Sequence, residues 1–314
     1  MLDNPMPHKI RKPNLFLVGA PKCGTTSLHN YLSQHPDVYM SPDKEPYYFC
    51  TDIKIRYRRH HYANEEAYLQ LFAGAGSEKY LGESTTFYLS SERAAHNIKE
   101  FTPDAKIICS LRNPVDMMYS MYRFQLKRGE ENARSFEEAL ALEPYRARGE
   151  RLPRACLFRN TLLYHSLASY ESQVRKYYDL FGRDQVYVVL FDDLYRDALQ
   201  TCRDLFKFLE IDVEAPIDIG TKNSTDAVKA SWSLWLGHAF PRVMNVSRRI
   251  VPARIRRTVM VNADWAFPRR FEPSSSLDRD LRNRLVHEFR PENEKLSRLI
   301  NRDLSAWIEP AVPQ

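Results

Sequence analysis

The first residues that could do chemistry follow an apolar run at 14–18 and surround Gly24. Three consecutive hydroxyl side chains come directly after this glycine: Thr25, Thr26 and Ser27. If the apolar run is a strand and the hydroxyl residues begin a helix, unpaired backbone N–H groups gather at the helix N-terminus, where the helix dipole favours an anion. Lys22 adds a full positive charge. The stretch therefore predicts a site for a phosphate-like group.

The glycine spacing is close to that of the phosphate loop of nucleotide triphosphatases, but the lysine stands elsewhere. Gly19 and Gly24 match the glycines of G-x-x-x-x-G-K-[ST], whereas Thr25 and Thr26 occupy the last two positions. Lys22 stands two residues before Gly24, a position that suits a shorter ligand tail than a triphosphate. An ordinary tight strand-to-helix turn is the alternative interpretation of the loop taken alone.

A second group of residues could bind another anion. Arg112 follows the apolar run 105–111, and open α/β sheets bind ligands at the carboxyl ends of their strands. Asn113 and Pro114 are typical of a helix N-cap and a first helical position. Ser120 lies seven residues after Asn113, about two turns further along the same side of that helix. Because arginine can bind a phosphate through two parallel hydrogen bonds, Arg112 with Ser120 predicts a second phosphate receptor; a surface ion pair and a solvated serine are the alternative.

The composition limits the class of protein without naming a partner. The chain has 314 residues, and its 46 lysines and arginines against 40 aspartates and glutamates give a net charge of +6. This mild excess suits an anionic cofactor or acceptor at least as well as nucleic acid, so we expect no nucleic-acid partner. The five cysteines show no C-x-x-C spacing, which indicates neither a zinc site nor a disulfide framework. We expect reduced thiols.

The sequence also predicts where the protein resides. The polar segment 1–12 has no apolar core for export, and we expect it to be a flexible N-terminus. No run of about 18 apolar residues occurs, so no membrane span is expected. We therefore expect a soluble, cytoplasmic protein; the oligomeric state is not predicted.

Strands and helices alternate along most of the chain. Strands are predicted at 14–18, 38–40, 79–83, 105–111 and 185–191, and helices at 25–34, 65–72, 92–101, from 114, 135–142, 161–181, 198–209, 277–289 and 292–307. Continuous apolar strands between helices indicate a parallel sheet covered on both faces. We predict one α/β domain over 1–314, with a central parallel sheet flanked by helices as in the P-loop nucleotide kinases. The Arg-, Trp- and Pro-rich segment 222–273 is expected to be a cap or insertion on the acceptor side.

Residues 20–28 and 111–122 together resemble the sulfotransferase family, whose members use 3′-phosphoadenosine 5′-phosphosulfate (PAPS). Further matches lie at 44–49, 82–89, 191–194 and 301–307. The resemblance implies that the first motif holds the 5′-phosphosulfate and that the second holds the 3′-phosphate through its arginine and serine. The donor-binding residues that it implies are Pro21, Lys22, Cys23, Gly24, Thr25, Thr26, Ser27, Arg112 and Ser120.

The same resemblance implies two candidates for the general base. The segment Lys-Glu-Pro-Tyr-Tyr-Phe, which begins at Lys44, is similar to the segment of heparan-type carbohydrate sulfotransferases that carries a catalytic glutamate, and this implies Glu45. Glu83 is the second candidate, in a motif that reads Glu-Lys-Ser in those enzymes. Ser84 replaces that lysine, so the transferring group must be stabilised by Lys22 or another cation. A loop carboxylate paired with Lys44 is the alternative interpretation of Glu45.

The expected activity is transfer of a sulfuryl group from PAPS to a hydroxyl or amine, first of a carbohydrate and next of a lipid or phenolic metabolite. Lys22 would stabilise charge on the bridging oxygen. No metal is expected, because a sulfuryl group carries one fewer negative charge than a phosphoryl group. Two alternatives stay open. A P-loop kinase or other nucleotide triphosphatase would need a lysine directly after Gly24, and a non-catalytic nucleotide- or polyanion-binding protein would not need Glu45.

Overall fold

The centre of the fold is a five-stranded sheet in which all strands are parallel. The computed structural model describes residues 11–53, 62, 64–219 and 277–309. The strands are β1 (Leu15–Gly19), β2 (Val38–Met40), β3 (Tyr80–Ser84), β4 (Lys106–Leu111) and β5 (Val186–Leu190), in the order β2-β3-β1-β4-β5. The predicted α/β fold with a parallel sheet is confirmed.

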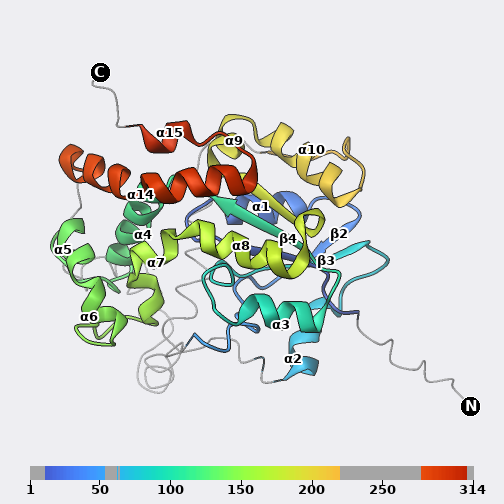
Figure 1. The fold of residues 1–314 in the computed structure, drawn as a ribbon. Helices are drawn as coiled ribbons and strands as arrows, with labels where there is room; N and C mark the ends of the chain where they lie inside the picture. Colours follow the sequence, from blue (N-terminus) through green and yellow to red (C-terminus); the bar gives the residue numbers. More distant parts are fainter. Residues whose placement is uncertain (1–10, 54–61, 63, 220–276, 310–314) are drawn as a thin grey trace, which may run out of the picture. The chain divides into compact units, whose positions relative to one another are not determined.

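Helices connect the strands, as parallel pairing requires. They are α1 (Thr25–Leu32), α2 (Glu65–Leu69), η1 (Gln70–Phe72), α3 (Ala94–Phe101), α4 (Pro114–Lys127), α5 (Phe136–Ala141), α6 (Glu143–Ala147), η2 (Arg159–Leu162), α7 (Tyr164–Ala168), α8 (Tyr170–Phe181), η3 (Arg183–Gln185), α9 (Phe191–Arg196), α10 (Ala198–Leu209), α14 (Arg279–Ile300) and α15 (Ser305–Ile308). Figure 1 shows α3, α8 and α14 on one side of the sheet.

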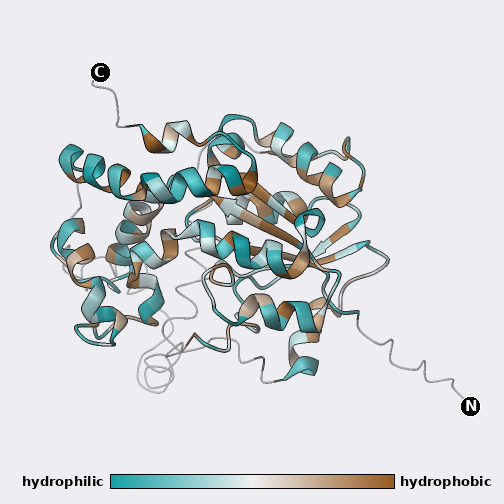
Figure 2. Cartoon of the chain, in the orientation of Figure 1, coloured by the Kyte–Doolittle hydropathy of each residue, from teal (hydrophilic) through white to brown (hydrophobic). Residues whose placement is uncertain are grey.

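The alternation of side chains along β1 builds one hydrophobic core on each face of the sheet. Phe16 and Val18 pack into a large core with residues of α3, α4, α8 and α14. Leu15 and Leu17 point the other way, into a smaller core with residues of α1 and α10. All five residues of β1 are buried, and the apolar strands stand out at the centre of Figure 2. Burial on both faces explains why this strand is apolar throughout.

Two predicted helical regions differ from the structure. The predicted helix 161–181 is broken into η2, α7 and α8, because side chains satisfy backbone carbonyls at the break: Ser169 Oγ donates to the carbonyl of His165 at 2.9 Å, and Gln173 Nε2 to that of Ser166 at 2.7 Å. The two predicted C-terminal helices are instead the continuous α14, which passes through Pro291, and the short α15. Burial of α14 side chains on both sides of Pro291 stabilises the helix despite the missing N–H.

The strand order puts the two predicted anion-binding segments side by side. From β1 the chain continues through α1 to β2 on one side, whereas β4 continues towards β5 on the other, so the direction of winding changes between β1 and β4. Ligands of open α/β sheets bind outside the carboxyl ends of the strands at this switch point. The loop after β1 and Arg112 after β4 both lie there.

Two predicted segments lie partly or wholly outside the described residues. Residues 1–10 of the predicted N-terminal extension are not described, nor is any of the predicted acceptor-side segment 222–273. Arg11 and Lys12 are described, and both are bound: Arg11 donates to the carbonyls of Glu78 and Gly76, each at 2.8 Å, and Lys12 forms an ion pair with Glu65 at 3.0 Å.

Candidate active site

The loop between β1 and α1 depends on two glycines. Gly19 has φ +145°, and a Cβ there would lie 2.5 Å from the carbonyl oxygen of Thr86. Gly24 has φ +80°, and a Cβ there would lie 2.8 Å from Leu194 Cδ2. Only glycine satisfies both the conformation and the space. The loop is therefore packed tightly against Thr86 and Leu194, which fixes the backbone that leads into α1.

Hydrogen bonds join this loop to β4. The backbone N–H of Ala20 donates to the carbonyl of Ser110 at 2.7 Å, and the Ser110 hydroxyl donates to the carbonyl of Cys23 at 2.5 Å. Ser110 lies two residues before Arg112. The first anion-binding segment is thus fixed to the strand that carries the arginine of the second.

Two cations lie beside the loop, each over an aromatic ring. The Lys22 ammonium is 4.3 Å from the centre of the Phe124 ring, and the Arg112 guanidinium is 4.6 Å from the centre of the Phe191 ring. Burial lowers the pKa of Lys22, and the charge of Arg112 lowers it further. The two positive charges repel each other. An anion bound near both would be attracted by each and would offset this repulsion. Lys22 also has φ 63°, a strained backbone of the kind that clusters at functional sites.

The other loop residues differ in what they can offer a ligand. Pro21 is buried, and so is Cys23, whose thiol lies 3.8 Å from the Tyr170 hydroxyl. Burial raises the pKa of this thiol to about 12, so it is neutral and only its backbone can serve an anion. Thr25 is buried at the start of α1, whereas Thr26 and Ser27 are exposed. Thr26 and Ser27 therefore present the accessible hydroxyls of the loop.

The helix after Arg112 begins as predicted. Asn113 caps α4: its Oδ1 accepts from the backbone N–H of Val115 at 3.0 Å and of Asp116 at 3.4 Å, and Pro114 takes the first helical position. Ser120 lies two turns further along and is half-buried, as is Arg112. Cap and helix thus hold both predicted 3′-phosphate ligands on one continuous strand-to-helix connection.

The matched segments 191–194 and 301–307 support the site from outside. Phe191 and Leu194 of α9 pack against Gly24, and the Phe191 ring carries Arg112. Asp192 accepts a hydrogen bond from Trp307 Nε1 at 2.8 Å. The C-terminal segment therefore fixes α9, and α9 in turn positions the loop and the arginine. The sequence showed that these segments match, but it did not show this role.

Glu45 lies beside the anion loop through Thr86. Its Oε2 accepts from the backbone N–H of Thr86 and its Oε1 from the Thr86 hydroxyl, both at 3.0 Å. The carbonyl oxygen of the same threonine lies close to Gly19. Burial raises the pKa of Glu45, while Lys44 and the donors of Thr86 and Tyr47 oppose the rise. A half-buried carboxylate with a raised pKa, held at the mouth of an anion loop, can accept a proton.

Glu83 occupies a different environment. It is 0% exposed, and its carboxylate accepts hydrogen bonds from three hydroxyls: Tyr68 at 2.7 Å, Tyr88 at 2.9 Å and Thr85 at 2.9 Å. Burial raises the pKa of Glu83 to about 7 despite these donors. Each oxygen thus already has a protein partner, inside the aromatic core next to β3.

The raised pKa of Glu83 predicts a pH-dependent loss of stability. Because the folded state holds this proton to about pH 7, and the unfolded chain only to its ordinary value of 4.5, the free energy of unfolding falls as pH rises through this window, by about 3 kcal/mol. Glu83→Gln should remove this part of the loss. Urea denaturation at pH 5 and pH 8 checks it: the variant should gain stability relative to the parent at the higher pH. An equal difference at both pH values would contradict the assignment.

The sulfotransferase domain family matches residues 12–249, more than half of the chain, and the chain belongs to this family. The predicted family is thus confirmed. The fold is similar to the crystal structure of a sulfotransferase from Alicyclobacillus acidocaldarius, with 32% identity, a TM-score of 0.71 and coverage of 96% of this chain and 100% of that one.

The names of two curated relatives mention a carbohydrate substrate. Carbohydrate sulfotransferase 15 of Mus musculus is 24% identical over 304 residues, which cover 81% of this chain and 54% of the relative. The bifunctional heparan sulfate N-deacetylase/N-sulfotransferase 3 of Homo sapiens is 24% identical over 307 residues, covering 95% of this chain and 31% of the relative. The chain spans about half or less of the length of these relatives.

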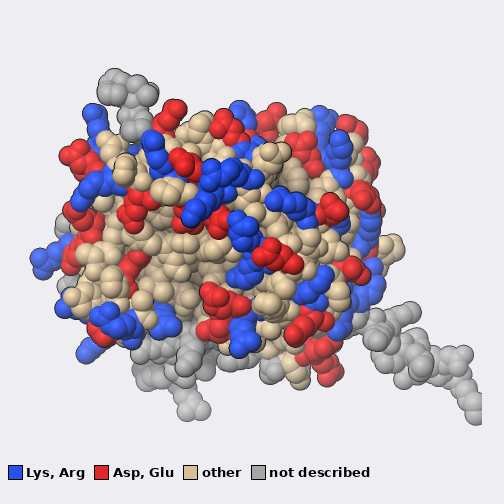
Figure 3. Space-filling view, viewed as in Figure 1, with Lys and Arg blue, Asp and Glu red and all other residues tan. Residues whose placement is uncertain are grey.

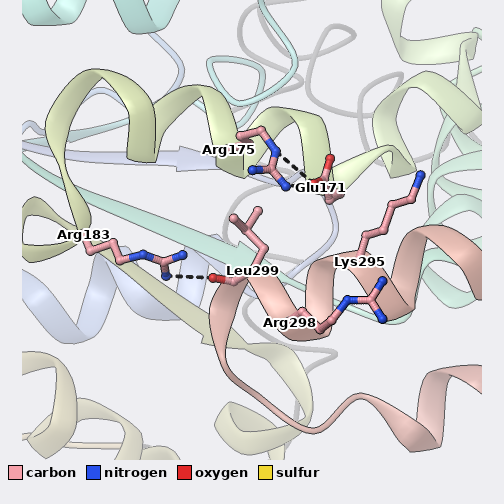
Figure 4. A pocket seen from close by; sticks show the side chains of 6 residues that line it. All are labelled: Glu171, Arg175, Arg183, Lys295, Arg298 and Leu299. Carbon is pink, nitrogen blue, oxygen red and sulfur yellow. Dashed lines mark hydrogen bonds and ion pairs between the residues drawn. The ribbon is translucent and has the colours of Figure 1, made fainter.

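A basic hollow of about 400 Å³ lies elsewhere, between α8 and α14. Figure 3 shows lysines and arginines interspersed with aspartates and glutamates on this face of the molecule. In Figure 4, Arg175 pairs with Glu171, and Arg183 donates to the carbonyl of Leu299 at 2.7 Å. The hollow is lined by helix residues, and none of the predicted site residues is among them. It is thus separate from the strand-end site.

Three further expectations concern metals, thiols and membranes. Within the ranges that the structure describes, no three His, Cys, Asp or Glu side chains are grouped so as to hold a metal ion; that the reaction needs none stays a prediction. All five cysteines lie among the described residues, are buried and form no disulfide with one another; that they stay reduced remains a prediction. In the described part of the chain, no helix combines the length and apolar character needed to cross a membrane. The cytoplasmic location stays a prediction.

Proposed function

We propose that this chain transfers the sulfuryl group of PAPS to a hydroxyl or amine of a carbohydrate. Membership of the sulfotransferase family supports the reaction class. The carbohydrate acceptor is supported by the names of the relatives carbohydrate sulfotransferase 15 and heparan sulfate N-deacetylase/N-sulfotransferase 3.

The observation that carries the proposal is the pair of anion-binding segments on adjacent strand ends. The loop with Lys22, at the N-terminus of α1, suits the 5′-phosphosulfate, and Arg112 with Ser120 suits the 3′-phosphate. Ser110 joins the two segments through its hydrogen bonds to Ala20 and Cys23. A donor with phosphates at the 3′ and 5′ positions of its ribose matches this arrangement. A mononucleotide with one phosphate group would use only one of the two segments.

In the proposed step the acceptor oxygen or nitrogen forms a bond to sulfur with its lone pair. The bond between sulfur and the bridging oxygen breaks, and 3′-phosphoadenosine 5′-phosphate (PAP) leaves with that electron pair. The acceptor proton passes to the carboxylate of Glu45. Lys22 and the backbone N–H groups of the loop stabilise the negative charge on the leaving oxygen. We assign the base to Glu45 rather than Glu83, because three hydroxyls occupy the buried carboxylate of Glu83.

A transfer assay tests the proposed function. The protein is incubated with PAPS carrying a labelled sulfuryl group and, separately, with a glycosaminoglycan oligosaccharide, a phenol and a sterol. Label should appear in the oligosaccharide and depend on Lys22, being lost in Lys22→Ala. Label in the phenol or sterol alone would overturn the carbohydrate acceptor, and binding of PAPS without transfer to any of the three would overturn the catalytic assignment.

A further inference from the structure

Lys44 extends from the loop after β2 to the first turn of α1. Its Nζ donates a hydrogen bond to Thr26 Oγ1 at 3.0 Å. Thr26 is exposed, and it belongs to the hydroxyl group that follows Gly24 at the helix N-terminus. The ammonium of Lys44 therefore lies at the opening of the anion loop, although Lys44 and Thr26 are 18 residues apart in the chain.

Lys44 and Glu45 direct their charges to two parts of the same site. The Glu45 carboxylate is held by Thr86, whose carbonyl lies against Gly19, and the Lys44 ammonium by Thr26, two residues after Gly24. Burial lowers the pKa of Lys44 and raises the pKa of Glu45, and the charge of each group opposes the shift of the other. The base must contact the acceptor, and the acceptor attacks sulfur, so a cation adjacent to the base lies on the side of the transferring group.

The neighbouring position 84 has no charge to offer. Ser84 is buried, and its hydroxyl forms a 2.8 Å hydrogen bond with His29 Nδ1. Burial and the nearby ammonium of Lys44 lower the pKa of His29 to about 4, so the imidazole is neutral at pH 7. The positive charge on this side of the loop therefore comes from Lys44 rather than from His29 or position 84.

We propose that Lys44 is a catalytic residue that binds the non-bridging oxygens of the transferring sulfuryl group. It supplies the positive charge that the Glu-Lys-Ser motif of heparan-type sulfotransferases carries at the position of Ser84. The inference rests on the proposed function, since it needs PAPS as the donor. When the donor binds, the Lys44 ammonium donates to sulfuryl oxygens from the position that its bond to Thr26 defines, and it keeps its protons throughout.

The comparison of PAPS with PAP tests this role without an acceptor, because PAP lacks only the sulfuryl group. Calorimetric titrations of Lys44→Gln should show an affinity for PAP within about 3-fold of the parent and an affinity for PAPS reduced about 10-fold, the loss of one charged hydrogen bond. With an acceptor that the parent enzyme sulfates, kcat should fall about 10²-fold, while Lys44→Arg keeps most of the activity. The matched control is Lys207→Gln, an exposed lysine of α10.

Each other outcome overturns either the role of Lys44 or the proposed function. Equal losses of PAP and PAPS affinity in Lys44→Gln would show that Lys44 only orders the loop through Thr26. Unchanged kcat and an unchanged affinity ratio would also overturn the role. A parent protein that binds neither nucleotide would overturn the proposed function itself, which separates that failure from a failure of the Lys44 assignment.

Discussion

Glu45→Gln is expected to lower kcat for sulfuryl transfer by about 10²–10⁴-fold, the usual contribution of a general base. The amide keeps the size and most of the hydrogen bonds of the carboxylate, but it cannot accept the acceptor proton. Because the loop around Lys22 and Arg112 is untouched, the affinity for PAP should change by less than about 3-fold. Initial-rate kinetics together with calorimetry measure both quantities on the same preparation.

Two further variants make this result specific. Glu66→Gln, at an exposed position of α2, removes a carboxylate away from the site and should leave both quantities unchanged. Glu83→Gln should retain transfer, since its carboxylate is enclosed by Tyr68, Tyr88 and Thr85. An active Glu45→Gln together with an inactive but folded Glu83→Gln would show that Glu83 is the base.

Arg112→Ala is expected to weaken PAP binding by about 10–100-fold, because it removes a charge-assisted contact to the 3′-phosphate. Adenosine 5′-phosphate, which lacks that phosphate, should bind the variant and the parent with affinities that differ by less than about 3-fold. Parallel titrations with the two nucleotides therefore isolate the contribution of one phosphate.

Arg203→Ala is the matched control for the loss of an arginine. It removes a side chain that pairs at the surface with Glu214, and the affinity for neither nucleotide should change. If Arg112→Ala weakened both nucleotides equally, the arginine would serve to order α9 and the loop rather than to bind the 3′-phosphate.

The sheet and the loop were predictable because their signals are local. The apolar runs of β1, β4 and β5, the glycines 19 and 24, and the cap Asn113 each specify structure within a few residues, and the structure has them as predicted apart from small shifts of the ends. The meeting of Lys22 with Arg112 followed from the rule that parallel strands end at one edge of the sheet.

The parts of the site that were missed depend on contacts between distant residues. Thr86 holds Glu45 across 41 positions, and Lys44 reaches Thr26 across 18. The ring of Phe191, which belongs to a different strand-to-helix connection, packs against the guanidinium of Arg112. The match at 191–194 marked this last segment, but no periodicity or spacing predicts which side chain a loop places against another.

Calorimetric titrations with PAP in the absence of a metal ion and, in parallel, with ATP–Mg²⁺ distinguish a sulfotransferase donor site from a triphosphate site. PAP is expected to bind without metal and ATP–Mg²⁺ far more weakly, and Lys22→Ala and Arg112→Ala are each expected to reduce the affinity for PAP. Binding of ATP–Mg²⁺ with no binding of PAP would contradict this expectation, since the loop after β1 would then serve a triphosphate in place of a 5′-phosphosulfate.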